Sequence, residues 1–183
     1  MKIEELKQSD AEIARAIHFL VNTCLDNDGK QKPLRTTKPL VVHSLRIAFH
    51  LLKQGYNKDI IIAAVLHDLP EDAGVEIESI KNKFGKKVAD IVSACTFDDL
   101  IKEKQKKYQE LFARTKAEGR DALIVKAADI LDNSNYFRFA EDRKAKKHLL
   151  EKWNHFLQAT QEIFSEPIYQ ELAERLKALA VKL

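Results

Sequence analysis

Four ionisable side chains stand at the end of a long apolar run. In VLHDLPEDAG, residues 65–74, a His-Asp pair follows the run directly, and a Glu-Asp pair comes four residues later. Burying an ionised group is costly unless a partner compensates for its lost hydration. A divalent cation does so, because imidazole nitrogen and carboxylate oxygen are natural metal ligands and binding keeps the Asp ionised and the His neutral. We therefore interpret His67 and Asp68 as candidate metal ligands.

Two more polar residues lie inside apolar segments elsewhere in the chain. His43 is surrounded by aliphatic residues in PLVVHSLRIAFHLLKQ, with Arg46 three residues later on the same helical face, and Asp129 lies within ALIVKAADILDN. Taken singly, each also fits a structural role, because a buried His is often a hydrogen-bonded core residue and an Asp near a helix end is often a cap. Their joint occurrence with His67 and Asp68 favours one mononuclear metal site.

The elements that must position these residues have helical patterns. Gly (5) and Pro (4) are scarce, and Leu, Ala, Lys and Glu recur at helical spacing. We predict an all-α bundle. Its first helix starts near Ser9 or Asp10 and stops before Gly29, and a loop covers 30–38. The later helices are expected at 39–55, from 58 through the apolar run IIIAAVL, and at 75–84, 88–95, 99–115, 120–137, 142–163 and 166–182. The run IIIAAVL indicates a helix that is buried on most sides at the centre of the fold.

The overall composition indicates one domain and excludes several partners. We expect residues 1–183 to form a single domain, with C-terminal helices over 142–182 that complete the core through Leu149, Leu150, Trp153, Phe156, Leu157 and Phe164; a homodimer interface is the alternative for those positions. The net charge of +3 is too small to indicate nucleic acid or membrane binding. Two distant cysteines and an N-terminus without a signal-peptide pattern predict a cytoplasmic protein.

The order His43, His67-Asp68, Asp129 resembles the His…His-Asp…Asp signature of the HD-domain metal-dependent phosphohydrolases, whose members are helical. Within that superfamily the chain is most similar, over residues 13–137, to the hydrolase domain of the RelA/SpoT alarmone enzymes and their small stand-alone relatives. AAVLHDLPEDAGVEIESIKNKFGKKVADIVSACT resembles that family's HDxxED segment, FG-xx-VA helix and following Thr, and IVKAADILDN resembles its K-x-AD-xxxN segment.

This resemblance implies an activity and roles for individual residues. The activity is release of pyrophosphate from the 3′ position of ppGpp or pppGpp, with Mn²⁺ held by the four candidate ligands and with Glu71 and Asp72 as the catalytic acidic pair. Such a polyanionic nucleotide needs cations around it. The candidates are Lys32, Arg35, Lys38, Arg46 and Lys126, although the loop lysines also fit plain surface charge. Thr96 matches the family Thr near the pocket, and Asn133 matches the sugar contact, with a helix cap as its alternative.

The proposed chemistry needs the acidic pair beside the ligands. On a continuing helix Glu71 lies one turn beyond His67, and Asp72 one turn beyond Asp68, so both would face the same groove. Pro70 tends to kink the chain there, and an ordinary solvated turn is the alternative for the pair. The metal would lower the pKa of a bound water from about 15.7 toward neutrality. Glu71 or Asp72 would orient or deprotonate that water.

Several positions depart from the family pattern. Leu34 stands where the family has the Arg that stacks on guanine; the other replacements are Leu40 for Tyr, Ser44 for Pro, Phe97 for Lys and Ile130 for Arg. A second hypothesis is therefore another HD-type nucleotide phosphohydrolase, such as a 5′-nucleotidase or a nucleoside triphosphate hydrolase. A third is a nucleotide sensor without turnover, against which the intact acidic pair argues. The ligand set also accepts divalent transition metals other than Mn²⁺, such as Fe²⁺ and Zn²⁺.

Overall fold

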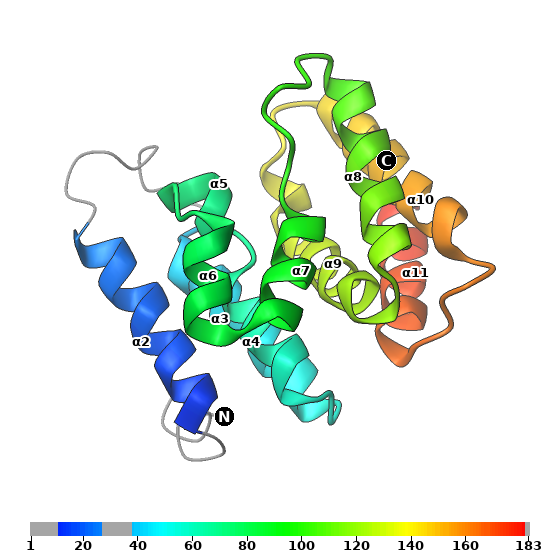
Figure 1. Cartoon of the computed structure of the whole chain (residues 1–183). Helices are drawn as coiled ribbons and strands as arrows, with labels where there is room; N and C mark the ends of the chain where they lie inside the picture. Colours follow the sequence, from blue (N-terminus) through cyan, green and yellow to red (C-terminus); the bar gives the residue numbers. More distant parts are fainter. Residues whose placement is uncertain (1–10, 27–37, 182–183) are drawn as a thin grey trace.

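The computed structural model describes residues 11–26 and 38–181, and every regular element within these ranges is helical (Figure 1). The predicted all-α class is therefore confirmed. The α-helices are α2 Ala11–Asp26, α3 Leu40–Lys53, α4 Lys58–Leu66, α5 Leu69–Ala73, α6 Ile77–Phe84, α7 Lys86–Cys95, α8 Lys104–Glu118, α9 Arg120–Asn133, α10 Arg143–Thr160 and α11 Pro167–Ala180, with a 3₁₀ helix at Ser134–Phe139. The predicted residues Lys32, Leu34 and Arg35 lie outside the described ranges.

Helix α4 runs through the centre of the core. Every residue from Ile60 to Leu66 is buried, as the uninterrupted apolar run predicts. Its first turn is fixed by Asn57, whose side chain accepts a hydrogen bond from the backbone N–H of Ile60 at 3.2 Å. Helices α2, α3, α7 and α9 pack around α4. A polar side chain at the end of α4 is therefore held deep inside the protein.

The helical path is interrupted close to Pro70, where a kink was predicted. Helix α4 ends at Leu66, and α5 begins at Leu69 after a turn through His67 and Asp68. Pro70 lies in the first turn of α5, where its missing N–H costs no helical hydrogen bond. Gly74 ends α5 with a left-handed φ of 67°. The two ligand candidates therefore lie in the turn between α4 and α5.

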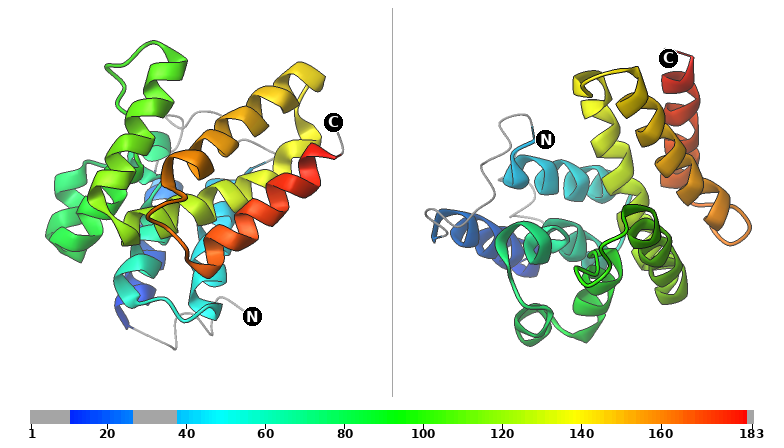
Figure 2. Two further views of the ribbon diagram at one scale, coloured as in Figure 1. Left: turned by 90° about the vertical axis from the view of Figure 1, so that its right-hand side faces the viewer. Right: turned by 90° about the horizontal axis from the view of Figure 1, so that it is seen from above.

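Helix α9 is the second buried helix, and the C-terminal helices cover it. Residues 122–132 are all buried, and α3, α4, α7, α8 and α11 contact α9. Figure 2 shows α11 lying alongside α9. Four of the apolar positions expected to complete the core are buried, namely Leu150, Trp153, Phe156 and Phe164, whereas Leu149 and Leu157 are partly buried. The prediction of a core role for these helices is thus confirmed.

Two predicted helix boundaries in the second half of the chain differ most from the structure. Helix α8 begins at Lys104 rather than near residue 99. The carboxylate of Asp98 accepts a hydrogen bond from the backbone N–H of Leu100 at 2.9 Å, an Asx-type turn that competes with helix. Helix α9 ends at Asn133, and the chain tightens into the 3₁₀ helix that follows.

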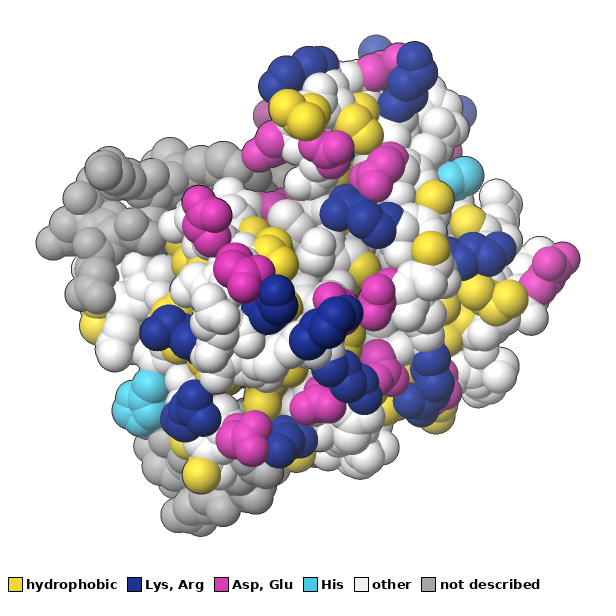
Figure 3. Space-filling model, viewed as in Figure 1, with side chains coloured by type: hydrophobic (Ala, Val, Ile, Leu, Met, Phe, Trp, Pro, Cys, Tyr) yellow, Lys and Arg dark blue, Asp and Glu magenta, His cyan; other side chains and the backbone are white. Residues whose placement is uncertain are grey.

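The described surface carries charges of both signs. On the face seen in Figure 3, basic and acidic side chains are interspersed, with hydrophobic side chains between them. Across the described ranges, none of the helices combines the length and the apolar character that a membrane crossing requires.

Candidate metal centre

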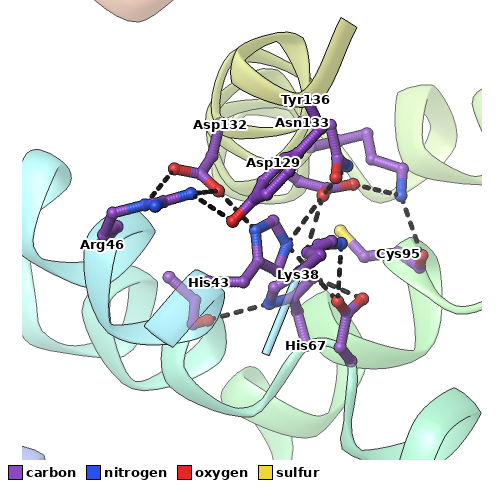
Figure 4. A network of polar contacts seen from close by, with 12 residues as sticks. Lys38, His43, Arg46, His67, Cys95, Asp129, Asp132, Asn133 and Tyr136 are labelled. Carbon is purple, nitrogen blue, oxygen red and sulfur yellow. Dashed lines mark hydrogen bonds and ion pairs between the residues drawn. The ribbon is translucent and has the colours of Figure 1, made fainter. Parts of the chain in front are cut away.

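Side chains from three separate helical regions converge at one buried point (Figure 4). His43 comes from α3, His67 and Asp68 from the turn after α4, and Asp129 from α9. The Nε2 atom of His43 lies 3.2 Å from Oδ1 of Asp129 and 3.4 Å from Oδ2 of Asp68. The Nε2 atom of His67 lies 3.1 Å from Oδ1 of Asp68 and 3.7 Å from Oδ1 of Asp129. Ligand atoms of His43, His67 and Asp129 all lie within 4.8 Å of one another, which is compatible with one shared ion.

The outer nitrogen of each imidazole fixes which nitrogen faces this point. The Nδ1–H of His67 donates to the backbone carbonyl of Ala64 at 2.9 Å, and the Nδ1–H of His43 donates to Oδ2 of Asp132 at 2.6 Å. Both Nε2 atoms are buried, and neither has a hydrogen-bond partner among residues 11–26 and 38–181. A buried polar atom left unpaired costs free energy, so it calls for a ligand. In the neutral ring each inward Nε2 carries a lone pair, and two such nitrogens beside two carboxylates fit a divalent cation.

Asp132 and Arg46 form a second layer behind His43. The guanidinium of Arg46 donates two hydrogen bonds of 2.8 Å to the two oxygens of Asp132, and a third to the hydroxyl of Tyr136 at 2.8 Å. Burial raises the pKa of Asp132, but the hydrogen bonds from His43 and Arg46 outweigh it and hold that pKa below its ordinary value. Arg46, a predicted phosphate contact, therefore binds a carboxylate of the protein itself. It also lines a cavity of about 580 Å³ between α3, α9 and α11, which is separate from the cavity beside the metal centre described below.

Neighbouring cations keep the two inner carboxylates ionised. Burial raises the pKa of Asp129, but Lys126, whose Nζ lies 2.9 Å from Oδ2, brings it well below its ordinary value. Burial acts in the same way on Asp68, where His67 and Lys38 hold its pKa low. The pKa of His67 is lowered by burial but raised more strongly by Asp68 and Asp129, to about 10. The two carboxylates therefore favour a positive charge between them, from a proton or from a metal ion.

A cavity of about 480 Å³ opens beside this cluster. The predicted acidic pair lines it, together with Asp68 and Asp129. Five positions that the sequence analysis named as substrate contacts or as departures from the family pattern also line it, namely Lys38, Phe97, Lys126, Ile130 and Asn133. Oε1 of Glu71 accepts a hydrogen bond from the backbone N–H of Phe97 at 2.8 Å. Burial raises the pKa of Glu71, an effect that Lys126 partly offsets. Both acidic side chains thus share one cavity with two of the ligand candidates, as the sequence predicted.

The remaining predicted contacts are placed differently. Asn133 donates to Oδ1 of Asp129 at 2.6 Å, so its amide orients a ligand candidate from one turn away. The hydroxyl of Thr96 donates to the carbonyl of Val92 at 2.8 Å and does not line the cavity, whereas the next residue, Phe97, does. Arg35 lies outside the described residues.

Sequence reasoning missed Asp132 and the aromatic and basic wall that α8, the 3₁₀ helix and α10 add to the cavity. Asp132 follows Asp129 by one turn inside the same apolar helix, so the same argument about buried charge points to it. The wall consists of Tyr108, Phe112, Tyr136, Phe139, Leu149, Lys152 and Trp153. Its aromatic members follow the helical spacing of core residues, and no local pattern distinguishes a cavity wall from a core.

Comparison with known proteins gives one family and several relatives. The family model described as HD domain matches residues 20–179. The guanosine-3′,5′-bis(diphosphate) 3′-pyrophosphohydrolase of Aquifex aeolicus (strain VF5) is 34% identical over 178 residues, which cover 96% of this chain and 23% of the relative. That of Drosophila melanogaster is 30% identical over 97 residues, 52% of this chain and 54% of the relative.

A solved structure shares the fold. The structure of a metazoan orthologue of SpoT, described as hydrolysing ppGpp, superimposes with a TM-score of 0.77 at 18% identity, covering 92% of this chain and 96% of that one. The present chain spans 23% of the Aquifex aeolicus relative and 25% of a second relative from Mycoplasma pneumoniae (strain ATCC 29342 / M129 / Subtype 1).

Proposed function

We propose, from the premise that this chain belongs to the HD domain family, that it is a metal-dependent phosphohydrolase which releases pyrophosphate from the 3′ position of ppGpp-like nucleotides. The main support is the arrangement of the metal centre. The Nε2 atoms of His43 and His67 face the ionised carboxylates of Asp68 and Asp129. The cavity beside them is also lined by the acidic pair and by lysines. The names of the relatives from Aquifex aeolicus and Drosophila melanogaster support the substrate and the bond cleaved.

In this proposal His43, His67, Asp68 and Asp129 hold the metal, which we propose to be Mn²⁺. Nitrogen and carboxylate ligands together suit such a divalent transition metal. When bound, the metal lowers the pKa of a water molecule and offsets the charge that builds on the phosphoryl oxygens.

Glu71 is the proposed proton acceptor for the attacking water. The backbone N–H of Phe97 fixes one of its carboxylate oxygens, and the other makes no hydrogen bond within the described part of the chain. Burial raises the pKa of Glu71 toward neutral pH, and a general base works best when its pKa lies near the operating pH. Asp72, on the same cavity wall, orients that water, and Lys126 and Lys38 limit the repulsion between the ligand carboxylates and the phosphate groups.

We further propose that the chain acts as one domain in the cytoplasm, on a small nucleotide. A highly charged nucleotide is a water-soluble substrate, which supports that location. The two cysteines, Cys24 and Cys95, form no disulfide with each other, which fits a reducing compartment.

Product analysis tests the proposed function. Mn²⁺-loaded protein is incubated separately with ppGpp, nucleoside monophosphates and nucleoside triphosphates. We expect GDP and pyrophosphate from ppGpp, none from the His67→Ala variant, and unchanged activity in His148→Ala, which removes an exposed histidine from α10. Intact ppGpp together with orthophosphate from monophosphates would instead support another HD-type hydrolase. Phe97 and Ile130, which line the cavity where the family pattern has basic residues, favour that second candidate.

A further inference from the structure

Lys152 is the one lysine along the described wall of the substrate cavity that lacks a carboxylate partner. It extends from α10 into the same cavity as Glu71 and Asp129. Its Nζ lies 3.3 Å from the hydroxyl of Tyr108, 4.5 Å from the centroid of that ring and 5.8 Å from the centroid of Trp153. Within the described ranges no carboxylate pairs with it, whereas Lys126 and Lys38, on the same cavity, pair with Asp129 and Asp68.

The surroundings of Lys152 are those of a cation that needs an anion. Burial lowers the pKa of Lys152 to about 8. Asp129 opposes this effect, and three further lysines, namely Lys126, Lys104 and Lys38, add to it. The two aromatic rings and the Tyr108 hydroxyl that surround the ammonium group carry no net negative charge, so they leave its positive charge unneutralised. A bound anion would restore the balance of charge at this end of the cavity.

Simple packing does not explain this position. A lysine that only covers apolar surface directs its ammonium group outward to water. Here the ammonium group is held on Tyr108 within the cavity, and the buried neighbour Trp153 forms the wall beside it. The cavity therefore has two charged regions: the metal centre, where Lys38 and Lys126 pair with ligand carboxylates, and the position of Lys152, which pairs with no carboxylate of the described residues.

We propose that Lys152 binds the phosphate group of the nucleotide that is remote from the bond cleaved, which for a ppGpp-like substrate is the 5′-diphosphate. The inference rests on the proposed function, in which the 3′-diphosphate occupies the metal centre. Lys152 is then a specificity-determining residue, because it selects nucleotides that carry an anionic group at both ends of the ribose. Lys152 does not strengthen the binding of a nucleotide that has a hydroxyl group at its 5′ position.

Kinetics with a matched pair of substrates test this role. KM and kcat are measured for ppGpp and for guanosine 3′-diphosphate, with wild type, Lys152→Met, Lys152→Arg and the control Lys147→Met. Lys147 lies on the same helix, is exposed and pairs with Glu151. We expect Lys152→Met to raise KM for ppGpp at least about 10-fold with kcat unchanged, to leave the 5′-hydroxyl substrate unaffected, and to be rescued by Lys152→Arg. Equal effects on both substrates, or none, would overturn the inference.

Binding of GDP decides the inference without turnover. Calorimetric titration should show at least about a 10-fold weaker Kd in Lys152→Met than in wild type and in Lys147→Met, with circular dichroism confirming an intact fold. The wild-type affinity should fall as the pH rises through about 8, because Lys152 loses its charge there, and the variant should not show that fall. Equal GDP affinities, or no GDP binding by wild type, refute Lys152 as a phosphate site. Absence of pyrophosphate release refutes the proposed function instead.

Discussion

The substitution Asp132→Asn keeps the shape of the side chain and removes the charge behind His43. The carboxylate accepts from Nδ1 of His43 at 2.6 Å and from two nitrogens of Arg46 at 2.8 Å each. An asparagine replaces one acceptor oxygen with an NH₂ donor, so either the imidazole or the guanidinium loses its partner. The Nε2 atom of His43 then becomes less basic and less well oriented. We expect Mn²⁺ affinity to fall about 10- to 100-fold, or about 1.4–2.7 kcal/mol.

A competition titration against a fluorescent chelator at fixed pH measures this change. The control is Asp90→Asn, which removes an aspartate that pairs with Lys86 on the surface of α7 and should leave the affinity within about 2-fold of wild type. Thermal melts of the metal-free variants separate loss of binding from loss of fold. If Asp132→Asn bound Mn²⁺ as tightly as wild type while Asp129→Asn did not, the orientation of His43 would come from packing alone, and our reasoning about the second layer would fail.

Three further predictions concern catalysis, pH and stability. Glu71→Gln should lower kcat by about 10²- to 10⁴-fold while metal analysis still finds a near-stoichiometric ion, and Asp72→Asn should likewise keep the metal and lose turnover; metal loss in either variant would contradict these roles. Because the carboxylates raise the pKa of His67 to about 10, Mn²⁺ must displace a proton below that pH. Calorimetry in buffers of different ionisation enthalpy should detect that proton, and the Mn²⁺ affinity should rise with pH. An affinity that stays the same between about pH 6 and about 9 would exclude proton displacement from His67. Phe156→Ala should lower the free energy of unfolding by about 3–5 kcal/mol in denaturant titrations, because that ring is fully buried and packs edge-on against Phe112; a loss below about 1 kcal/mol would show a looser core.

The helices and the central cluster were predictable because both depend on local rules. The run before His67 is apolar on every side, which predicts a buried helix, and the cost of burying a charge then points to a ligand. The same rule identifies Asp129 within α9. Helix ends were less accurate where a side chain competes with the backbone, as Asp98 does before α8.

The role of a side chain that contacts a distant helix was not predictable, because the sequence around one residue does not show which helices pack against it. The role of Arg46 changes because α9 brings Asp132 to it from 86 residues away in the sequence. Lys152 belongs to a helix that is amphipathic like many others, and only its position over the cavity distinguishes it from Lys147 on the exposed side. Asp132 was within reach of the argument that identified Asp129, since both interrupt the same apolar face.

The most direct test of the metal centre is X-ray diffraction from Mn²⁺-soaked crystals, with data collected on both sides of the manganese absorption edge. We expect one strong anomalous peak within bonding distance of Nε2 of His43, Nε2 of His67 and the carboxylates of Asp68 and Asp129, and its loss in His67→Ala crystals. A fully occupied manganese elsewhere, or an empty cluster whose two imidazoles still face the carboxylates, would contradict it.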